Sequence, residues 1–494
     1  MREAILTSGN TLADGAPFYS QPFFVSTSIL NMVNLVQWTS MMLMPTMLKE
    51  IQSDFDLGPE ALGGVMMARE LILYALSPVF GYCADTYNRR IVLAMGILAW
   101  GLAMIIAGAA KQYAELLAAM LLMGSGMAAT VPVSYSLLGD YYDSADLGKA
   151  FGWLGFSSVI GALCGVVLPT AVAEVDFGVN IRPWRFCTYM LGCVVLLTSI
   201  VVIGVVRNPQ RKGDAQGISW ATVRGFMRNR TYMLVLAQGF FASLAWDNMS
   251  FMMLWFECMG FNMYQAAIVF GVCCIGAAVG GLFGGYTGDW ATARSKRYGR
   301  LVVAQCSVFL GIPFAYVYYG GHIPQDAEHL GMYAVVGFFF GFSVSWPASS
   351  CILPIIAEIV PPNALGTGYA VDRLVEGVAT SWGSLLVGFV AKANGYKGGT
   401  VCDSTDKQVR HEQAGALGHA MTITMCVPWF ICFLIFFVLY FTYYGDRVDL
   451  DENKDDAEAE RRGLLMSSDD EAGPSRPYDD EAENVNLADD EVLG

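Results

Sequence analysis

The sequence predicts an all-α membrane protein in which twelve transmembrane helices form two pseudo-symmetric halves of six helices each. Three observations predict this fold class: the composition, the apolar stretches, and a loop motif that occurs twice. The chain has 494 residues, of which 55% are apolar and only 15% are charged. An ordinary soluble protein has about 25% charged residues, so this composition indicates a chain that crosses a bilayer several times.

The apolar stretches are long enough to cross a bilayer as helices. Residues 91–110 and 427–444 are examples of such runs, since a spanning helix needs about 20 residues. The bilayer offers no water to backbone groups, so spans are helices or closed barrels, and the sequence lacks the alternating polarity of barrel strands. We expect helices at residues 23–47, 60–82, 91–111, 114–138, 148–173, 184–206, 231–256, 264–287, 300–320, 331–357, 366–392 and 416–444.

One loop motif occurs in both parts of the chain. Residues 78–90 read PVFGYCADTYNRR, and their Gly-Tyr-x-x-Asp pattern returns at residues 285–289, again followed by basic residues. In the helix count these motifs end the second and the eighth spans, which are six helices apart. A second correspondence aligns Asp140 with Glu358, after the fourth and tenth spans. The repeat predicts a transporter of two six-helix halves, with its substrate near the midplane between them.

The charges divide the chain into segments and orient it in the membrane. The linker between the halves carries six basic residues and one acidic residue, and positive charge near span ends marks the cytosolic side. An even number of spans then makes both termini cytosolic. The C-terminal tail carries 18 acidic and five basic residues, which predicts disorder. We expect an N-terminal segment without a cleavable signal, the first half, the linker, the second half and the tail at residues 1–22, 23–206, 207–230, 231–445 and 446–494.

The repeated motif and the helix plan resemble the major facilitator superfamily and its fold. The segment SPVFGYCADTYNRR (77–90) is similar to the loop between helices 2 and 3 of the spinster-like branch, which includes lysolipid and sphingolipid carriers. LLMGSGMAATVPVSYSLLGDYYD (121–143) is similar to the fourth helix of that branch. GYAVDRLVEGVATSWGSLLVGFVAKANGYKGG (368–399) resembles a neighbouring branch found in plants and protists. The resemblance covers residues 23 to 444 and implies a secondary transporter.

The first and fourth spans depart from the pattern of the spinster-like branch. That branch places an Asp-Arg pair after an Asn in the first helix, whereas Asn34 is followed here by Gln37 and Trp38 at those positions. It places a Glu in the fourth helix where this chain has Met127. Proton coupling, if present, therefore needs another group. Asn34, Gln37 and Trp38 share one helix face, and this face lines a substrate cavity or forms hydrogen bonds to other helices.

Charged residues inside the spans are the candidates for substrate binding and coupling, because charge in a bilayer is costly and usually functional. Asp247 lies near the middle of the seventh span, with Asn248 beside it. We expect Asp247 to bind the substrate or carry the coupling proton; packing is the alternative. Arg69 and Glu70 lie within the second span and are either coupling residues or an ion pair that packs two helices.

A further set of charged residues lies near the predicted cytosolic loops and suggests a gate. The motif carboxylates can accept hydrogen bonds from a helix N-terminus of the other half, and the arginines that follow can reach loop acids. The alternative is a simple loop cap. In the eleventh span two acids spaced i,i+4 share a face with an arginine, and they serve either the gate or packing. These gate candidates are Asp85, Arg89, Arg90, Asp289, Asp372, Arg373 and Glu376.

The tail contains a candidate sorting signal. In EAERRGLLMSSDDE, the pattern Glu460-x-x-x-Leu464-Leu465 resembles the acidic dileucine signal that clathrin adaptors bind. The pattern is short, so a chance match is the alternative. It predicts a lysosomal or endosomal membrane, with the plasma membrane as the alternative.

Motifs for other chemistry are missing from the sequence. There is no phosphate-binding loop and no Cys/His spacing typical of a metal site, so we expect no cofactor, no metal, no nucleic-acid partner and no enzymatic activity. Most of the twelve cysteines lie in apolar spans. Cys258 and Cys402 fall near one predicted membrane face, but their pairing cannot be deduced from the sequence.

We therefore expect a secondary active transporter that works by alternating access. Its expected substrate is a small organic solute, and one candidate class is an amphiphile similar to a lysolipid or sphingolipid. Transport is either coupled to protons or not. Two alternatives stay open: an uncoupled facilitator of another nutrient or metal complex, and a non-transporting receptor or scaffold on the same fold.

Overall fold

The computed structural model of the chain is helical, and it contains no β-strand among the residues that it describes. Ten helices in this part of the chain are long and apolar enough to cross a membrane. The structure describes residues 23–142, 144–173, 181–209, 224–225, 228–295, 297–347, 351–360, 365–399 and 401–471.

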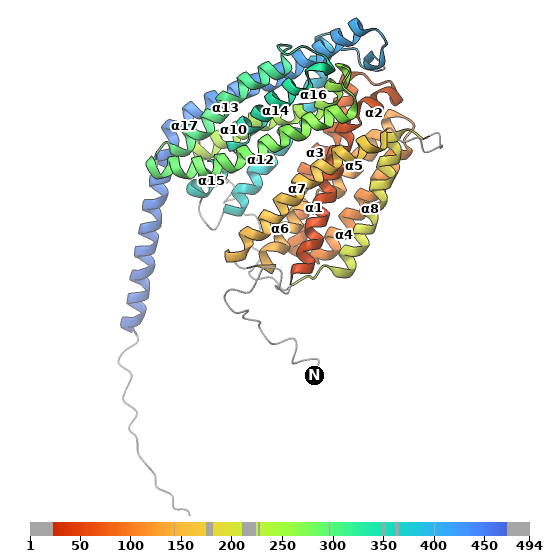
Figure 1. The fold of residues 1–494 in the computed structure, drawn as a ribbon. Coiled ribbons are helices and arrows are strands. Elements are labelled where there is room, and N and C mark those ends of the chain that lie inside the picture. Colours follow the sequence, from red (N-terminus) through yellow and green to blue (C-terminus); the bar gives the residue numbers. More distant parts are fainter. Residues whose placement is uncertain are drawn as a thin grey trace, which may run out of the picture.

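The first half of the chain folds as one helical bundle (Figure 1, red to yellow). In it α1 packs against α7, and α4 packs against α5 and α8. A Cβ atom at Gly161 would lie 2.2 Å from the carbonyl oxygen of Leu35, so the small residue permits the close approach of α7 to α1. The helices are α1 (Phe24–Thr46), α2 (Leu48–Phe55), α3 (Pro59–Thr86), α4 (Arg89–Ala109), α5 (Tyr113–Met127), α6 (Thr130–Tyr141), α7 (Ser144–Ala173) and α8 (Pro183–Val205).

The second half forms the other bundle (Figure 1, green to blue). α12 packs against α14, while α10 and α13 pack against α17. A capping box starts α12, because the side chains of Asn262 and Gln265 each accept a hydrogen bond from the other's backbone N–H. The elements are α10 (Arg230–Trp246), η2 (Asp247–Phe251), α11 (Met252–Cys258), α12 (Met263–Arg294), α13 (Gly299–Tyr319), η3 (Ala327–His329), α14 (Leu330–Val344), α15 (Leu353–Ile359), α16 (Leu365–Ala393), η6 (Val401–Asp403) and α17 (Lys407–Glu471).

The arrangement is consistent with twelve spans. α5 and α6 follow one another as a single span, Tyr113–Tyr141. Two further segments are added to the ten apolar helices: α1, and the seventh segment, which consists of α10, η2 and α11. The short 3-10 helix η2 interrupts the seventh segment at Asp247, so a charged residue lies where the helix is broken.

The main contact between the two halves is formed by α3 and α16. Near α2, Ser384 Oγ of α16 donates a hydrogen bond to the carbonyl oxygen of Gly63 in α3 (3.3 Å). Cys258 and Cys402 form a disulfide, and we call this end of the molecule the disulfide end. The opposite end, where the repeated motifs lie, is the motif end. Figure 1 shows the bundles meeting at the disulfide end and diverging toward the motif end, near α6 and α15.

The last helix extends beyond the bundle. α17 continues to Glu471, past residue 446, where the sequence predicts that the tail begins. Residues 450–466 are rich in Glu, Lys, Arg, Ala and Leu, which have high helix propensity. The first part of the predicted tail is therefore helical in the structure, and Figure 1 shows it projecting away from the bundle.

Candidate functional site

Arg69 and Glu70 form a buried ion pair in α3. Arg69 Nη2 lies 2.9 Å from Glu70 Oε1, and the two residues are 1% and 4% exposed. Arg69 Nη1 also donates to the carbonyl oxygen of Met41 in α1 (3.3 Å). These contacts hold Arg69 within the N-terminal half.

Asp247 faces this pair from the C-terminal half. Its Oδ2 accepts a hydrogen bond from the backbone N–H of Ser384 (2.7 Å) and its Oδ1 accepts one from Ser250 Oγ (2.9 Å). Asp247 is 6% exposed. A Cβ atom at Gly383 would lie 2.8 Å from Asp247 Cβ, so the glycine permits α16 to approach the break in the seventh segment.

The three side chains form a charge cluster between the halves. Glu70 interacts electrostatically with Asp247 and with Arg69. Two carboxylates and one guanidinium leave an excess negative charge, which is costly in a buried site unless it is compensated. Among the described residues, Glu70 Oε2 and Arg69 Nε have no hydrogen-bond partner. The cluster can therefore take up one positive charge, such as a proton, and can still form hydrogen bonds.

The polar residues of α1 bond to neighbouring helices of the same half. Asn34 Nδ2 donates to Ser157 Oγ (2.9 Å), Ser158 Oγ (2.7 Å) and a backbone carbonyl of α7. Gln37 Oε1 accepts a hydrogen bond from Thr130 Oγ1 (2.6 Å). These are helix–helix hydrogen bonds, which is one of the two alternatives that the sequence leaves open; substrate contact by this face stays a prediction.

Two further candidates beside these residues differ in exposure. Trp38 is 36% exposed, whereas Asn248 is fully buried. Asn248 Nδ2 donates to Thr424 Oγ1 (3.0 Å) and to the carbonyl oxygen of Met421 (2.6 Å). Asn248 thus joins the broken seventh segment to α17, next to Asp247.

The gate candidates at the motif end contact residues of their own half. Arg89 forms an ion pair with Asp140 and donates to Asn208 Oδ1 (3.2 Å). In the C-terminal half, Arg300 pairs with Glu358 (3.5 Å) and with Asp289 (3.8 Å). The two acids that the sequence repeat aligns, Asp140 and Glu358, therefore each bind an arginine that follows a loop motif.

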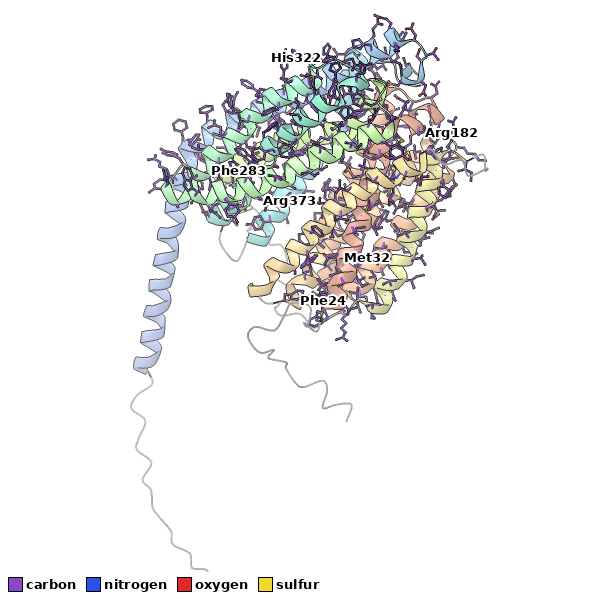
Figure 2. The ribbon with its side chains drawn as sticks, viewed as in Figure 1. Phe24, Met32, Arg182, Phe283, His322 and Arg373 are labelled. Carbon is purple, nitrogen blue, oxygen red and sulfur yellow. A yellow bond between two sulfur atoms is a disulfide. The ribbon has the colours of Figure 1, made fainter. Side chains whose placement is uncertain are left out.

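The other gate candidates lie at the motif end and on α16. The side chain of Asp85 lies outside the described part of the structure, and that of Arg90 is half-buried. Arg373 pairs with Glu376 (2.9 Å) and is 57% exposed. Figure 2 shows Arg373 on the side of the C-terminal half that faces the other half.

Asp372 is a fully buried acid in α16. It is 0% exposed, and neither carboxylate oxygen has a hydrogen-bond partner among the described residues. A Cβ atom at Gly239 of α10 would lie 3.7 Å from Asp372 Oδ1 and 3.3 Å from Glu376 Oε1. The glycine thus makes room for both acids between α10 and α16, and the gate role of this pair stays a prediction.

Three charged residues that the sequence did not single out lie together at the disulfide end: Lys49, Glu257 and Asp403. Glu257 and Asp403 are the chain neighbours of Cys258 and Cys402, and this adjacency is the signal that could have found them. In the described part of the chain, no group of His, Cys, Asp and Glu side chains could hold a metal ion. The side chains of Glu460, Leu464 and Leu465 lie outside the described ones.

Comparison with known proteins identifies one family. The model of the Major Facilitator Superfamily matches residues 29–384. Among curated proteins, the chain is 23% identical to "Protein spinster" of Drosophila melanogaster over 386 residues, which cover 74% of this chain and 62% of that protein. It is 21% identical to "Sphingosine-1-phosphate transporter SPNS2" of Xenopus tropicalis over 416 residues, 78% of this chain and 77% of that protein.

Solved structures show the same fold. A bacterial homolog of the human lysosomal transporter spinster, in an inward-facing and unoccupied conformation, superimposes with a TM-score of 0.73 at 17% identity, covering 85% of this chain and 98% of that chain. A D-xylose–proton symporter superimposes with a TM-score of 0.63 at 13% identity, covering 83% and 97%. At these identities the likeness concerns the fold alone.

Proposed function

This chain belongs to the major facilitator superfamily and is a multi-pass membrane transporter, and we propose that it is a proton-coupled carrier of an amphiphilic organic solute. The observation that carries the proposal is the cluster of Arg69, Glu70 and Asp247 between the two halves. Glu70 and Asp247 come from different halves, so their separation changes when the halves move.

Alternating access supplies the coupling step. Arg69 is anchored to α1, and Asp247 is anchored to Ser384 of α16. When the two halves move relative to one another, Asp247 moves away from Arg69 and Glu70. Arg69 then compensates the charge of Glu70 but no longer that of Asp247. Protonation of one carboxylate offsets the lost compensation, since an unpaired buried charge is costly. The proton thereby favours one orientation of the halves over the other.

The closed end of the structure supports an inward-facing assignment. Cross-half hydrogen bonds lie at the disulfide end, whereas the ion pairs of Arg89 and Arg300 at the motif end stay within one half. With the motif end on the cytosolic side, as the charged loops predict, the protein is closed to the opposite side. The motif carboxylates Asp85 and Asp289 then form hydrogen bonds across the halves when the cytosolic side closes.

The substrate class rests on the relatives and on the chemistry of the site. One relative carries the name of a sphingosine-1-phosphate transporter. A lysolipid or sphingolipid combines a polar head with an apolar chain, and this chain offers a charged cluster and the exposed ring of Trp38 between largely apolar helices. We place the carrier in a lysosomal or endosomal membrane, with Glu460, Leu464 and Leu465 as the clathrin-adaptor signal.

One observation favours an uncoupled facilitator as the second candidate. Gln37 and Met127 occupy the positions where the spinster-like pattern has acids, and Gln37 is satisfied by Thr130. If Arg69, Glu70 and Asp247 only pack the halves together, the protein equilibrates its substrate without responding to a pH gradient.

Transport by reconstituted vesicles distinguishes these candidates. Lipid and metabolite profiles of cells with and without the protein select the substrate, and a fluorescent lysophospholipid is the first probe. Across about one pH unit, one coupled proton supplies about 1.4 kcal/mol, which corresponds to about tenfold accumulation. The Asp247→Asn variant is expected to exchange the probe but no longer to accumulate it.

The matched control is Glu412→Gln, which removes an exposed carboxylate at the disulfide end and should accumulate the probe as the wild type does. Gradient-driven accumulation by Asp247→Asn would exclude Asp247 as the coupling residue and leave Glu70→Gln as the next variant to test. If the wild type itself ignores the gradient, the facilitator is the correct assignment.

A further inference from the structure

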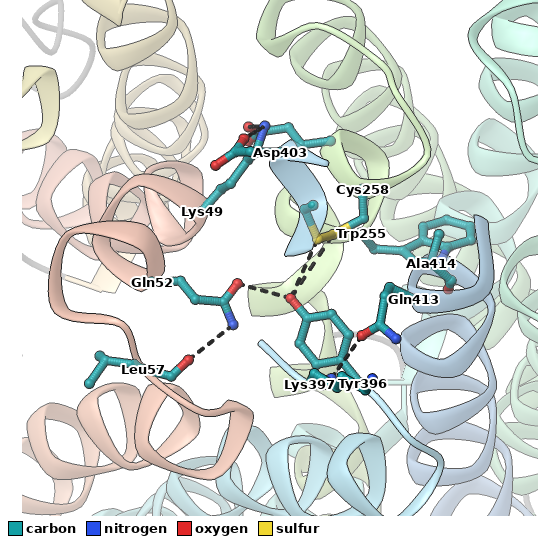
Figure 3. The surroundings of a disulfide bond; sticks show 12 residues. Lys49, Gln52, Leu57, Trp255, Cys258, Tyr396, Lys397, Asp403, Gln413 and Ala414 are labelled. Carbon is teal, nitrogen blue, oxygen red and sulfur yellow. Dashed lines mark hydrogen bonds and ion pairs between the residues drawn. A yellow bond between two sulfur atoms is a disulfide. The ribbon is translucent and has the colours of Figure 1, made fainter. Parts of the chain in front are cut away.

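The loop between α16 and α17 crosses from the C-terminal half onto the N-terminal half. We call residues 394–399 and 401–403 of this loop the strap. The Tyr396 hydroxyl donates a hydrogen bond to Gln52 Oε1 of α2 (2.9 Å), and the Gly399 N–H donates to the carbonyl oxygen of Leu57 (3.1 Å). Figure 3 shows Tyr396 reaching between α2 and the disulfide. The strap is therefore a bridge between the halves.

Glycine is required where the strap meets the N-terminal half. Gly398 and Gly399 have φ angles of +77° and +63°, a region that other residues rarely adopt. A Cβ atom at Gly398 would also lie 2.8 Å from the carbonyl oxygen of Leu57 and 2.9 Å from Gln52 Nε2. The Gly-Gly pair thus permits a close backbone contact that a side chain would block.

A lysine of the N-terminal half lies between two acids of the C-terminal half. Lys49 Nζ lies 2.8 Å from Asp403 Oδ1 and 3.8 Å from Glu257 Oε2. The Lys49 side chain is 23% exposed and that of Glu257 is 8% exposed, so solvent screens this pair less than a surface pair. These ion pairs reinforce the bridge that the strap makes.

The disulfide determines where both acids lie. Glu257 directly precedes Cys258 at the end of α11, and Asp403 directly follows Cys402 in the strap. The bond between the two cysteines therefore places the two carboxylates on either side of Lys49. The Tyr396 hydroxyl lies 3.6 Å from Cys402 Sγ and 4.0 Å from Cys258 Sγ, so the same bond also supports the tyrosine that contacts Gln52.

We propose that the Cys258–Cys402 disulfide controls the closure of the disulfide end according to its redox state. Lys49 is the positioning residue, because its ion pairs with the acids next to the two cysteines depend on the disulfide. This inference rests on the proposed alternating access. In the oxidised protein the strap moves with α11, and Asp403 of the strap and Glu257 of α11 hold Lys49 and keep this end closed. Reduction frees the strap from α11, Asp403 leaves Lys49, and the closed state becomes less populated.

The chemical step is an ordinary thiol–disulfide exchange. A dithiol attacks the S–S bond as a thiolate and forms a mixed disulfide with one cysteine, and the other cysteine leaves and takes up a proton. The second thiol of the reagent then closes its own ring and releases the first cysteine, which is also protonated. The protein gains two electrons and two protons, and the dithiol becomes a cyclic disulfide. Disulfides persist on the non-cytosolic side of membranes, where the predicted orientation places this end.

Hydrogen–deuterium exchange of the full-length purified protein in lipid nanodiscs tests the proposal without any substrate. Dithiothreitol is expected to raise the exchange rate of residues 48–58 and of the strap by about three- to tenfold, the range that one ion pair and one hydrogen bond account for. Peptides from α13 and α14 should not change. The Lys49→Met variant should show the raised rate already when oxidised, and dithiothreitol should add little to it.

Two matched variants separate positioning from a general loss of structure. Lys49→Arg keeps the charge and should retain the slow exchange and the response to dithiothreitol. Lys392→Met removes another cross-half ion pair, with Glu60, at an exposed position, and should leave the response of the strap to dithiothreitol unchanged. The Cys258→Ser/Cys402→Ser double variant should show the raised exchange rate of the strap without dithiothreitol. If this variant fails to fold, the dithiothreitol measurement on the wild type decides the question.

Three results would overturn the proposal. These are an unchanged strap after reduction, an equally large response to dithiothreitol in Lys49→Met and wild type, and an equal rise of exchange throughout the C-terminal half. None of these results depends on a transport assay, so failure here differs from failure of the proposed coupling by Asp247.

Discussion

The motif end and the disulfide end of the molecule are held together in different ways. At the motif end, Arg89 pairs with Asp140 in one half, and Arg300 pairs with Glu358 in the other. The sequence repeat aligns the two acids, Asp140 and Glu358, and each of the two arginines follows a loop motif. At the disulfide end, Arg185 pairs with Asp54 within the N-terminal half, but other pairs cross between the halves, such as Lys49 with Asp403. The crossing pairs have no repeated counterpart among the ion pairs of the described residues.

The difference shows which contacts a duplication preserves. A contact inside one half is copied with that half, so both copies retain an acid at the aligned position and an arginine after the loop motif. A contact between halves joins two non-identical surfaces, and each partner can change independently of its repeat equivalent. The motif end therefore stabilises each half as a unit, whereas the disulfide end holds the two units together.

The largest expected effect is the loss of the buried pair at the motif end. The Arg89 side chain is only 3% exposed, and removing one partner of a buried pair costs about 3–5 kcal/mol because the other charge remains uncompensated. Arg89→Met should therefore lower the thermal unfolding midpoint strongly, as measured by intrinsic fluorescence in detergent. The variant of the arginine that pairs with Glu358 in the other half, Arg300→Met, at a side chain that is 16% exposed, should lower it less. Equal effects would contradict the assignment of Arg89 as the more buried anchor.

An intermediate effect is expected from the strap. Gly398→Ala places a Cβ atom 2.8 Å from Leu57 O at a positive φ, whereas Gly395→Ala has a positive φ but no atom within 4 Å of the new Cβ. The conformational cost is about 1–2 kcal/mol for both, so any additional loss in Gly398→Ala measures the contact between the halves. Unfolding midpoints of the two variants supply the comparison. If the unfolding midpoints of the two variants fall equally, Gly398 makes no close contact with the N-terminal half.

The smallest expected effect concerns Glu50 of α2, close to Lys49. Burial raises the pKa of Glu50 above its usual value, while Arg182 and Lys49 partly oppose that shift. A raised pKa means that the folded protein prefers the protonated form, so the stabilisation is complete below the usual pKa of 4.5 and is lost as the pH rises through the raised value. Glu50→Gln should match the wild type near pH 4 and unfold at a slightly higher temperature at pH 7.5.

The control for Glu50 is an exposed carboxylate at the same end, Glu412→Gln, which should unfold at the same temperature as the wild type at pH 7.5. If the difference between the unfolding midpoints of the wild type and of Glu50→Gln is the same at pH 4 and at pH 7.5, solvent screens Glu50 completely.

Much of the fold could be predicted from the sequence. The apolar runs identified the helices, and the Gly-Tyr-x-x-Asp repeat identified the two halves, because both signals are local in the chain. Several helix boundaries differ from the expectation, among them the start of α17 at Lys407 instead of residue 416, and two differences matter most. The seventh segment is broken into α10, η2 and α11 at Asp247, and α17 continues as a helix past residue 446 because good helix formers follow. The buried and the lipid-facing sides of a spanning helix are both apolar, so hydrophobic periodicity carries little information about packing.

The candidate site was predictable residue by residue but not as a cluster. A charge inside an apolar run is visible in the sequence and marks Arg69, Glu70, Asp247 and Asp372 individually, because the bilayer makes each of them costly. Only the folded chain decides that Glu70 and Asp247 interact across the halves, while Asp372 lies apart against Gly239. The polar face of α1 is a second example in which the sequence does not show the partners. The side chains of Asn34 and Gln37 form hydrogen bonds with neighbouring helices of the same half.

The sequence alone determined the helical class, the duplication and the identity of the costly charges, since these follow from composition and from residues close together in the chain. The tertiary structure alone decided which residues meet across the two halves. Cys258 and Cys402 are separated by 144 residues, and Lys49 is farther still from Asp403, so nothing local specifies their contact. It arises because the packing of α3 on α16 brings the strap onto α2, where a disulfide places two acids around one lysine.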